Sequence, residues 1–383
     1  MNKTRNIIYL SNFIFTFGLG LAIYINSSFL SSFVGEGMTG IVYALGSLGS
    51  IVAILIAPAI FKKIGGYKFL LLVTFLDALS FLGVSLVQNP WGIVLLFIFG
   101  FSFNTLIVFS LDEFLKISSQ NASIGKIRGS YLAIIHLALI GAQLSILTFL
   151  SKFPYQTIYF VAFLAMLVFL LVSYWKLKEI PEPNYDKLKT VTFVKKFFKN
   201  KNLRRGYGFS FLVNFFYSWM LIYTPIYLIR HLGFTLGEVS AIFMFMLLPF
   251  LFMPIWTGRL ADKIGERKLL MFGFAIASIA VFSIYFQTEK ILWIWALLLF
   301  LSRVGISTTE SMSDTYFFKH INAENEEFVG VYRSASPAAN ILGPLCAVLL
   351  FIFLPSFNYI YLILSAIMLY GVYLSSTIRK SDI

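Results

Sequence analysis

Cysteine and histidine are almost absent from this chain of 383 residues, which contains one cysteine, Cys346, and three histidines, His136, His231 and His320. A single cysteine excludes an intramolecular disulfide, and the histidines are too far apart for zinc-type spacing. Charge is scarce too, because Asp, Glu, Lys and Arg make up 12% of the chain, against about a quarter in ordinary soluble domains. Such a chain cannot cover a water-facing surface, so we expect lipid around it, and neither a metal nor a cofactor.

Hydrophobic residues make up 59% of the chain, and they form runs of the length that crosses a bilayer, about 20 residues. Only helices satisfy the backbone of such runs in lipid, and no alternating barrel pattern is present. The sequence therefore predicts an all-α integral membrane protein with twelve transmembrane helices. The expected spans are residues 7–28, 38–60, 69–87, 91–114, 129–150, 157–175, 207–229, 237–257, 269–287, 291–316, 329–352 and 357–377.

The start of the chain has the form of a signal peptide, because Lys3 and Arg5 precede an apolar run. We interpret this run as the first span instead. It is long enough to cross a bilayer, and its removal would leave an odd number of helices in the repeat described below.

The net charge of +13 comes from basic residues that lie between the apolar runs. With the N-terminus in the cytoplasm, 26 of the 30 Lys and Arg residues fall on the cytoplasmic side, three fall on the other side, and Arg303 falls inside a span. The excess of Lys and Arg on cytoplasmic loops sets the orientation of a membrane protein. We therefore expect both termini in the cytoplasm and no nucleic-acid partner. We also expect a monomer and, since no targeting extension is evident, a bacterial-type cytoplasmic membrane.

One long polar stretch divides the spans six and six. We predict an N-terminal six-helix bundle over residues 1–175, a cytoplasmic basic linker over 176–206, and a C-terminal six-helix bundle over 207–383. The basic and aromatic segment 193–198 fits either a helix lying on the anionic inner leaflet or a solvated loop.

Two local matches relate the two halves. Residues 60–68 (IFKKIGGYK) match 260–268 (LADKIGERK) at an offset of 200, and residues 125–128 (GKIR) match 330–333 (GVYR) at an offset of 205. The nearly equal offsets and the same in/out orientation indicate a parallel duplication of six helices, as in several transporter folds.

The segment 258–268 resembles the cytoplasmic signature of the major facilitator superfamily through Gly258, Asp262, Gly265 and Arg267. The resemblance implies two pseudo-symmetric six-helix bundles, alternating access, and a central cavity lined by spans 1, 4, 7 and 10. The copy after span 2 departs from the signature, since its positions are filled by other residues: Pro58, Lys62 and Tyr67.

The resemblance also places the inner end of span 8 opposite the start of span 5, and the inner end of span 2 opposite the start of span 11, which carries Arg333. We hypothesise two cytoplasmic latches, which are ion-pair contacts that hold the inner side closed in one state, with the charges swapped between them. The alternative is that these residues are ordinary charges of cytoplasmic loops. The latches would pair Asp262 with Lys126 and Arg128, and Lys62 and Lys63 with Glu326 and Glu327.

Four polar residues of span 10 lie on one helical face: Arg303, Ser307, Glu310 and Asp314. A charge within the membrane is costly, so each is a functional hypothesis. Glu310 and Asp314 are one turn apart, which disfavours ionisation of both, and Glu310 is the leading candidate for proton coupling. Arg303 would hold an anionic substrate group or neutralise Glu310. The alternative is a buried pair that fixes helix packing.

Span 7 is rich in aromatic residues, and a cavity with aromatic walls and few polar groups suits an amphipathic solute. The alternative for any single aromatic residue is a lipid-facing position. The candidate substrate contacts outside span 10 are Asn12, Asn214, Tyr217, Trp219 and Tyr223.

These features predict a secondary transporter, with proton-coupled export of an amphipathic or hydrophobic compound as the leading form. Uptake of a metabolite such as a sugar or an organic anion is the alternative in the same class. A membrane-embedded enzyme would need clustered acid, base or metal-binding residues, and the only acidic cluster has no His or Cys beside it. A scaffold or receptor would leave the intramembrane charges unexplained.

Overall fold

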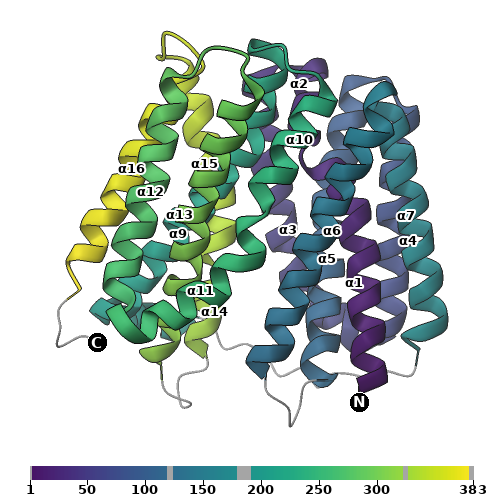
Figure 1. The fold of residues 1–383 in the computed structure, drawn as a ribbon. Helices are drawn as coiled ribbons and strands as arrows, with labels where there is room; N and C mark the ends of the chain where they lie inside the picture. Colours follow the sequence, from purple (N-terminus) through teal and green to yellow (C-terminus); the bar gives the residue numbers. More distant parts are fainter. Residues whose placement is uncertain (1, 119–123, 179–190, 322–326, 379–383) are drawn as a thin grey trace. The chain divides into compact units, whose positions relative to one another are not determined.

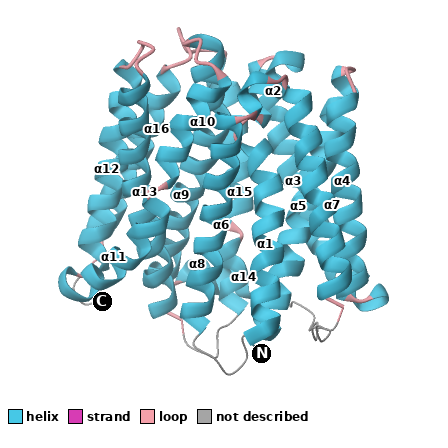
Figure 2. Ribbon diagram, turned by 45° about the vertical axis from the view of Figure 1, so that its right-hand side comes forward, coloured by secondary structure: helices cyan, strands magenta, loops and turns pink. Residues whose placement is uncertain are grey.

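The structure is a computed structural model that describes residues 2–118, 124–178, 191–321 and 327–378. All regular elements in these ranges are helical, as Figure 2 shows. In chain order the elements are α1 (Asn2–Ile23), α2 (Asn26–Val34), α3 (Glu36–Ile64), α4 (Gly66–Leu86), α5 (Pro90–Ser118), α6 (Ile124–Thr148), η1 (Leu150–Lys152), α7 (Tyr155–Lys176), α8 (Val191–Lys199), α9 (Lys201–Ile226), η2 (Tyr227–His231), α10 (Leu236–Leu247), α11 (Pro249–Ile264), α12 (Glu266–Phe286), α13 (Leu292–Lys319), α14 (Glu327–Arg333), α15 (Ala335–Phe351) and α16 (Tyr359–Ser376).

Twelve helical segments within the described residues are long and apolar enough to cross a membrane, which confirms the predicted fold class. Most bounds agree with the expected spans to within a few residues. The first and seventh spans are longer than expected, at Thr4–Val34 and Lys201–His231, 31 residues each. In the first span, polar residues such as Asn26 and Ser27 lower the local hydropathy, but the span continues as α2 after a short break.

The chain divides into two compact units, which are residues 1–186 with 235–241, and residues 187–234 with 242–383. The six spans of each unit pack in the same pattern (Figure 1). In the first unit, α1 packs on α5, α6 and α7, α5 packs on α3 and α4, and α4 packs on α7. In the second unit, α9 packs on α13, α15 and α16, α13 packs on α11 and α12, and α12 packs on α16. The predicted duplication is thus present in the packing of both units.

Matching glycines form the turn between the second and third spans of each unit. Gly65 has φ of 83° and Gly265 has φ of 81°, a region that side chains with a Cβ rarely adopt. Each glycine N–H caps the preceding helix by bonding the carbonyl four residues earlier, Phe61 in the first unit and Ala261 in the second. The sequence match at an offset of 200 therefore corresponds to one backbone conformation made twice.

Three spans are irregular. The first is interrupted between α1 and α2 at residues 24–25, and the seventh ends in the π-helical turn η2, two residues after Pro225. The eighth is interrupted at Leu248, between α10 and α11, because Pro249 lacks the N–H that would continue the helical ladder. The matching span of the first unit, α3, is continuous.

The linker contains a helix, α8, and its side chains are only partly exposed. Phe197 is buried in a cluster with Leu203, Phe317, Phe328 and other residues at the ends of α9, α13 and α14. Lys195 and Lys199 of the same helix are exposed. The segment that we expected either on the leaflet or as a solvated loop is therefore an amphipathic helix docked on the second unit by an aromatic residue.

Candidate functional site

The four polar residues of span 10 lie along one side of α13, and that side changes from buried to accessible along its length. Arg303 is 4% exposed and Ser307 is 1% exposed. Glu310 and Asp314, one and two turns further on, are exposed on the surface of the second unit. The predicted shared face is present, with its cation enclosed and its two carboxylates accessible.

Each of the two carboxylates accepts a hydrogen bond from a tyrosine on another helix. The Tyr217 hydroxyl of α9 donates to Glu310 Oε2 at 2.6 Å, and the Tyr332 hydroxyl of α14 donates to Asp314 Oδ1 at 2.7 Å. The Tyr332 hydroxyl also lies 3.0 Å from Ser313 Oγ. Hydrogen bonds to a carboxylate are short and strong when the acceptor is ionised. The pair Glu310 and Asp314 is thus fixed to the two helices that flank α13 at this level.

Arg303 lies against the aromatic face of α9. Its guanidinium carbon is 5.2 Å from the ring centre of Phe216 and 5.4 Å from that of Tyr217, distances at which a cation is attracted to a ring face. Tyr217 therefore contacts Arg303 with its ring and Glu310 with its hydroxyl. One side chain connects the cation and the carboxylate, which are about 10 Å apart along the helix axis.

The other aromatic candidates of span 7 pack within the unit. Trp219 is fully buried and donates from Nε1 to the Gly343 carbonyl at 2.7 Å. The Tyr223 hydroxyl, also buried, donates to the Pro344 carbonyl at 3.3 Å. The structure gives both side chains a role in joining α9 to α15, and their predicted contact with a solute stays a prediction.

The two asparagine candidates make local contacts. Asn214 Nδ2 donates to the Ser210 carbonyl one turn earlier, at 2.8 Å. Asn12, in the first unit, is buried and accepts from Thr16 Oγ1 at 3.3 Å. The contact of both residues with a solute stays a prediction.

The predicted cytoplasmic signature joins helices within the second unit. Glu266, next to Gly265, forms an ion pair with Lys319 at the end of α13. Arg267 Nη2 donates to the Ser376 carbonyl at 2.9 Å and so caps the last turn of α16. These contacts hold the start of α12 against the ends of its two neighbours.

The copy of the signature after span 2 also bonds a backbone carbonyl near the end of the last span of its unit, but through a tyrosine instead of an arginine. The Tyr67 hydroxyl donates to the Tyr174 carbonyl at 2.7 Å, near the end of α7. Tyr67 matches Arg267 at an offset of 200, and Tyr174 matches Ser376 at 202. A neutral hydroxyl thus bonds the end of α7 in the first unit, as a guanidinium bonds the end of α16 in the second.

The remaining gate candidates lie at helix ends or outside the described part. Lys62 and Lys63 are exposed at the end of α3, Gly258 is exposed within α11, and Arg333 is exposed at the end of α14. Glu326 lies outside the described residues, and so do the side chains of Lys126, Arg128, Asp262 and Glu327. Both predicted latches stay predictions.

Sequence reasoning missed several partners of the candidate residues: Tyr332 beside Asp314, Phe216 beside Arg303, and Lys319 beside Glu266. Tyr332 lies in segment 330–333, which matches segment 125–128. This match drew attention to Arg333, and it was the one feature of the sequence that could have indicated Tyr332. Phe216 and Lys319 carried no signal that separated them from the other aromatic and basic residues. In the described ranges, no group of His, Cys, Asp and Glu side chains could hold a metal ion.

The comparisons agree with this architecture. Residues 209–380 match the sequence profile of the Major Facilitator Superfamily. No curated protein matches the chain. The chain is similar in structure to the nucleoside transporter NupG, with a TM-score of 0.76 at 13% identity over 98% of each chain. It is also similar to a POT family transporter in complex with 5-aminolevulinic acid, with a TM-score of 0.78 at 12% identity over 96% of this chain and 94% of that one.

Identities this low show a shared fold and nothing more specific. The duplicated six-span units, with charged side chains inside the spans, define a multi-pass membrane protein with the fold of these transporters. The second half of the chain therefore matches the Major Facilitator Superfamily in sequence, and the whole chain shares its fold with these transporters.

Proposed function

We propose that the protein is a proton-coupled secondary transporter in which Glu310 takes up and releases the coupling proton. The observation that carries the proposal is the accessible carboxylate of Glu310 within a membrane span, bonded at 2.6 Å to Tyr217 Oη. A carboxyl group that alternates between charged and neutral forms needs contact with water in at least one state, and Glu310 is exposed on its unit.

The connection through Tyr217 gives this proton a way to act on substrate. The Tyr217 ring lies 5.4 Å from the Arg303 guanidinium. When Glu310 is ionised it holds the Tyr217 hydroxyl, and when it is neutral that bond weakens. Protonation at Glu310 then changes how firmly the ring under Arg303 is held. Asp314, one turn away, favours a single negative charge on the pair.

The leading direction is export of an amphipathic or hydrophobic compound across the cytoplasmic membrane. The support is the number of aromatic residues on α9 beside the carboxylates, and the small number of hydrogen-bonding groups among them. Tyr217, which is partly exposed, supplies apolar ring surface, and Glu310 supplies one acceptor for a polar or cationic end of the solute.

The second candidate is uptake of a polar metabolite, and Arg303 favours it. A buried guanidinium binds carboxylate and phosphate groups well. The structural neighbours include a nucleoside transporter and a POT family transporter in complex with a peptide conjugate. Under this reading Arg303 contacts an anionic group of the incoming solute.

The test is flux in proteoliposomes with and without an imposed pH gradient, for the wild type, Glu310→Gln and the control Glu289→Gln. Glu289 is an exposed carboxylate in the loop before α13, so the control makes the same chemical change outside the site. We expect the gradient to drive the wild type and the control, and to have no effect on Glu310→Gln. Gradient-driven flux in Glu310→Gln would refute the coupling role. The sign of the gradient that drives accumulation decides between export and uptake.

A further inference from the structure

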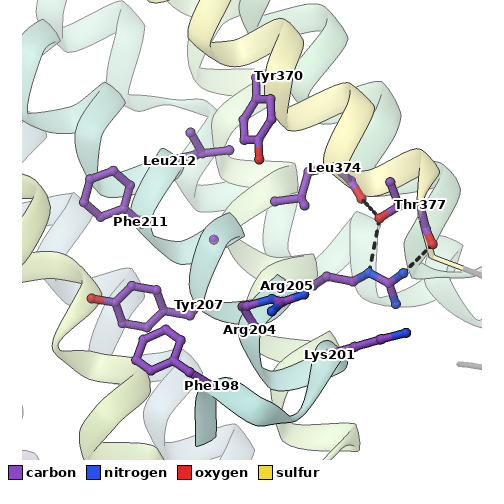
Figure 3. A pocket seen from close by; sticks show the side chains of 11 residues that line it. Phe198, Lys201, Arg204, Arg205, Tyr207, Phe211, Leu212, Tyr370, Leu374 and Thr377 are labelled. Atoms are coloured by element: carbon purple, nitrogen blue, oxygen red, sulfur yellow. Dashed lines mark hydrogen bonds between the residues drawn. The ribbon is translucent and has the colours of Figure 1, made fainter. Parts of the chain in front are cut away.

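A pocket with basic and aromatic walls lies at one end of the second unit, away from the carboxylates of α13. It has a volume of about 540 Å³ and lies between the end of α8, the first three turns of α9 and the last turns of α16 (Figure 3). It belongs to the end of the unit that the charge distribution assigns to the cytoplasmic side. Nothing in the proposed transport step uses it.

The pocket has two chemically different parts. Lys201, Arg204 and Arg205 line it at the start of α9, and Phe211, Leu212 and Leu374 line it deeper along the same helices. Figure 3 shows the three basic side chains close together, with Phe211 and Leu212 further along α9. From Lys201 to Leu212 the helix rises about 16 Å, so the wall changes from cationic to apolar over roughly half the thickness of a hydrocarbon core.

The three basic residues have different roles. Arg205 forms hydrogen bonds within the protein: Nη2 donates to the Thr377 carbonyl at 2.6 Å and Nε donates to Thr377 Oγ1 at 3.1 Å. These bonds join the end of α16 to the start of α9 and so form one wall of the pocket. Lys201 and Arg204 are exposed, and their charged ends are available to a ligand in the pocket.

Glycine keeps the pocket open beside the apolar part. Gly208 lines the pocket, and a Cβ at this position would lie 2.9 Å from Leu374 Cδ2. Any larger side chain would therefore enter the space between α9 and α16. Phe198 and Tyr207 form an aromatic edge nearby, with ring centres 5.1 Å apart.

We propose that this pocket binds an anionic phospholipid of the cytoplasmic leaflet, with the headgroup phosphate at Lys201 and Arg204 and an acyl chain along Phe211, Leu212 and Leu374. Charge complementarity carries the choice of ligand, because clustered basic side chains beside a transmembrane helix recognise anionic headgroups. The apolar depth of the pocket separates a lipid from a soluble anion, which has nothing to place there.

The experiment compares the binding of phosphatidylglycerol and phosphatidylcholine to the full-length protein in detergent, by native mass spectrometry. The variants are Lys201→Ala with Arg204→Ala, and a charge-matched control, Lys176→Ala with Lys268→Ala, whose residues are exposed at the ends of α7 and α12. We expect the wild type and the control to prefer phosphatidylglycerol. The pocket variant should lose roughly 10- to 30-fold in phosphatidylglycerol affinity, the effect of two cations near an anionic headgroup.

Unchanged phosphatidylglycerol binding in the pocket variant would overturn the proposal, and so would an equal loss in the control. Glycerol 1-phosphate and inorganic phosphate form a separate arm, because they carry the anionic group without the acyl chain. If either binds as tightly as phosphatidylglycerol, the site takes a soluble anion and the lipid proposal is wrong. Phe211→Ser should weaken binding of the lipid and leave binding of glycerol 1-phosphate unchanged.

Discussion

At the scale of single residues, tyrosine hydroxyls are hydrogen-bond partners of the two carboxylates of α13. Glu310 and Asp314 each accept from a tyrosine of a different helix. A hydroxyl stabilises an ionised carboxylate without cancelling its charge, so the carboxylate can still exchange a proton. This choice of partner suits a group that changes its protonation state during transport.

The two tyrosines provide a direct comparison of the two carboxylates. Tyr217→Phe removes a donor to the ionised form of Glu310 and should move the pH midpoint of gradient-driven transport to higher pH. Tyr332→Phe, which makes the same change beside Asp314, should leave the midpoint in place. The measurement is the initial rate of flux in proteoliposomes between pH 5 and 9. A shift with Tyr332→Phe alone would assign the proton to Asp314.

Asp77, on α4 in the first unit, is a buried carboxylate with a partner on the neighbouring helix α5. Asn104 Nδ2 donates to Asp77 Oδ1 at 3.0 Å and to the Gly100 carbonyl at 2.8 Å. Asp77→Asn keeps the shape and the acceptor, so we expect gradient-driven flux to persist and the free energy of unfolding to change by about 1 kcal/mol or less. Loss of gradient-driven flux in this variant, with normal folding, would give Asp77 a coupling role.

At the scale of helices, the sequence predicted where spans occur better than how they are interrupted. Hydropathy depends on composition, so twelve runs were visible and their number was right. The interruption at Leu248 and the π-helical turn Tyr227–His231 depend on backbone geometry that no average over a window records. The tyrosine partners of the carboxylates were also hard to predict from the sequence, because they depend on how helices pack. Tyr217 stood among many aromatic residues, and Tyr332 meets Asp314 only when α14 packs beside α13.

The contact between α12 and α13 depends on two facing glycines. A Cβ at Gly305 would lie 2.5 Å from the Ala277 nitrogen and 2.6 Å from the Gly273 carbonyl oxygen, both backbone atoms of α12. Gly305→Ala must therefore push the helices apart, and we expect a loss of about 1–3 kcal/mol. Gly129→Ala, at an exposed helical glycine with open space around it, is the control. Thermal unfolding in detergent should show a lower midpoint for Gly305→Ala and no decrease for the control.

At the scale of the whole chain, the duplication allows a residue of one unit to be tested in the other. Arg267→Tyr places the side chain of the matched position, Tyr67, at the end of α16. Since Tyr67 bonds the corresponding carbonyl of Tyr174, Arg267→Tyr should preserve more stability than Arg267→Ala. We expect Arg267→Ala to cost about 1–2 kcal/mol through the lost hydrogen bond to the Ser376 carbonyl. Equal thermal midpoints for the two variants would show that the matched contacts are not equivalent.

The predicted orientation can be measured with single cysteines. Cys346 is the only native cysteine, so Cys346→Ala gives a background without thiols. In intact cells, a membrane-impermeant maleimide should label Lys290→Cys and should fail to label Lys268→Cys until the membrane is opened. The reverse pattern would place both termini outside the cytoplasm.

The eighth span differs from its counterpart in the way it would bend. The helix α3 runs without a break through Pro58, whereas α10 and α11 are separated at Leu248, where Pro249 lacks the N–H that would continue the helix. Two helices joined at a position that lacks a helical hydrogen bond bend at that position before either helix bends. Amide hydrogens near residues 245–251 should therefore exchange with deuterium sooner than those near residues 45–51. We expect α11 to move relative to α10 in the second unit, and α3 to move as one helix in the first.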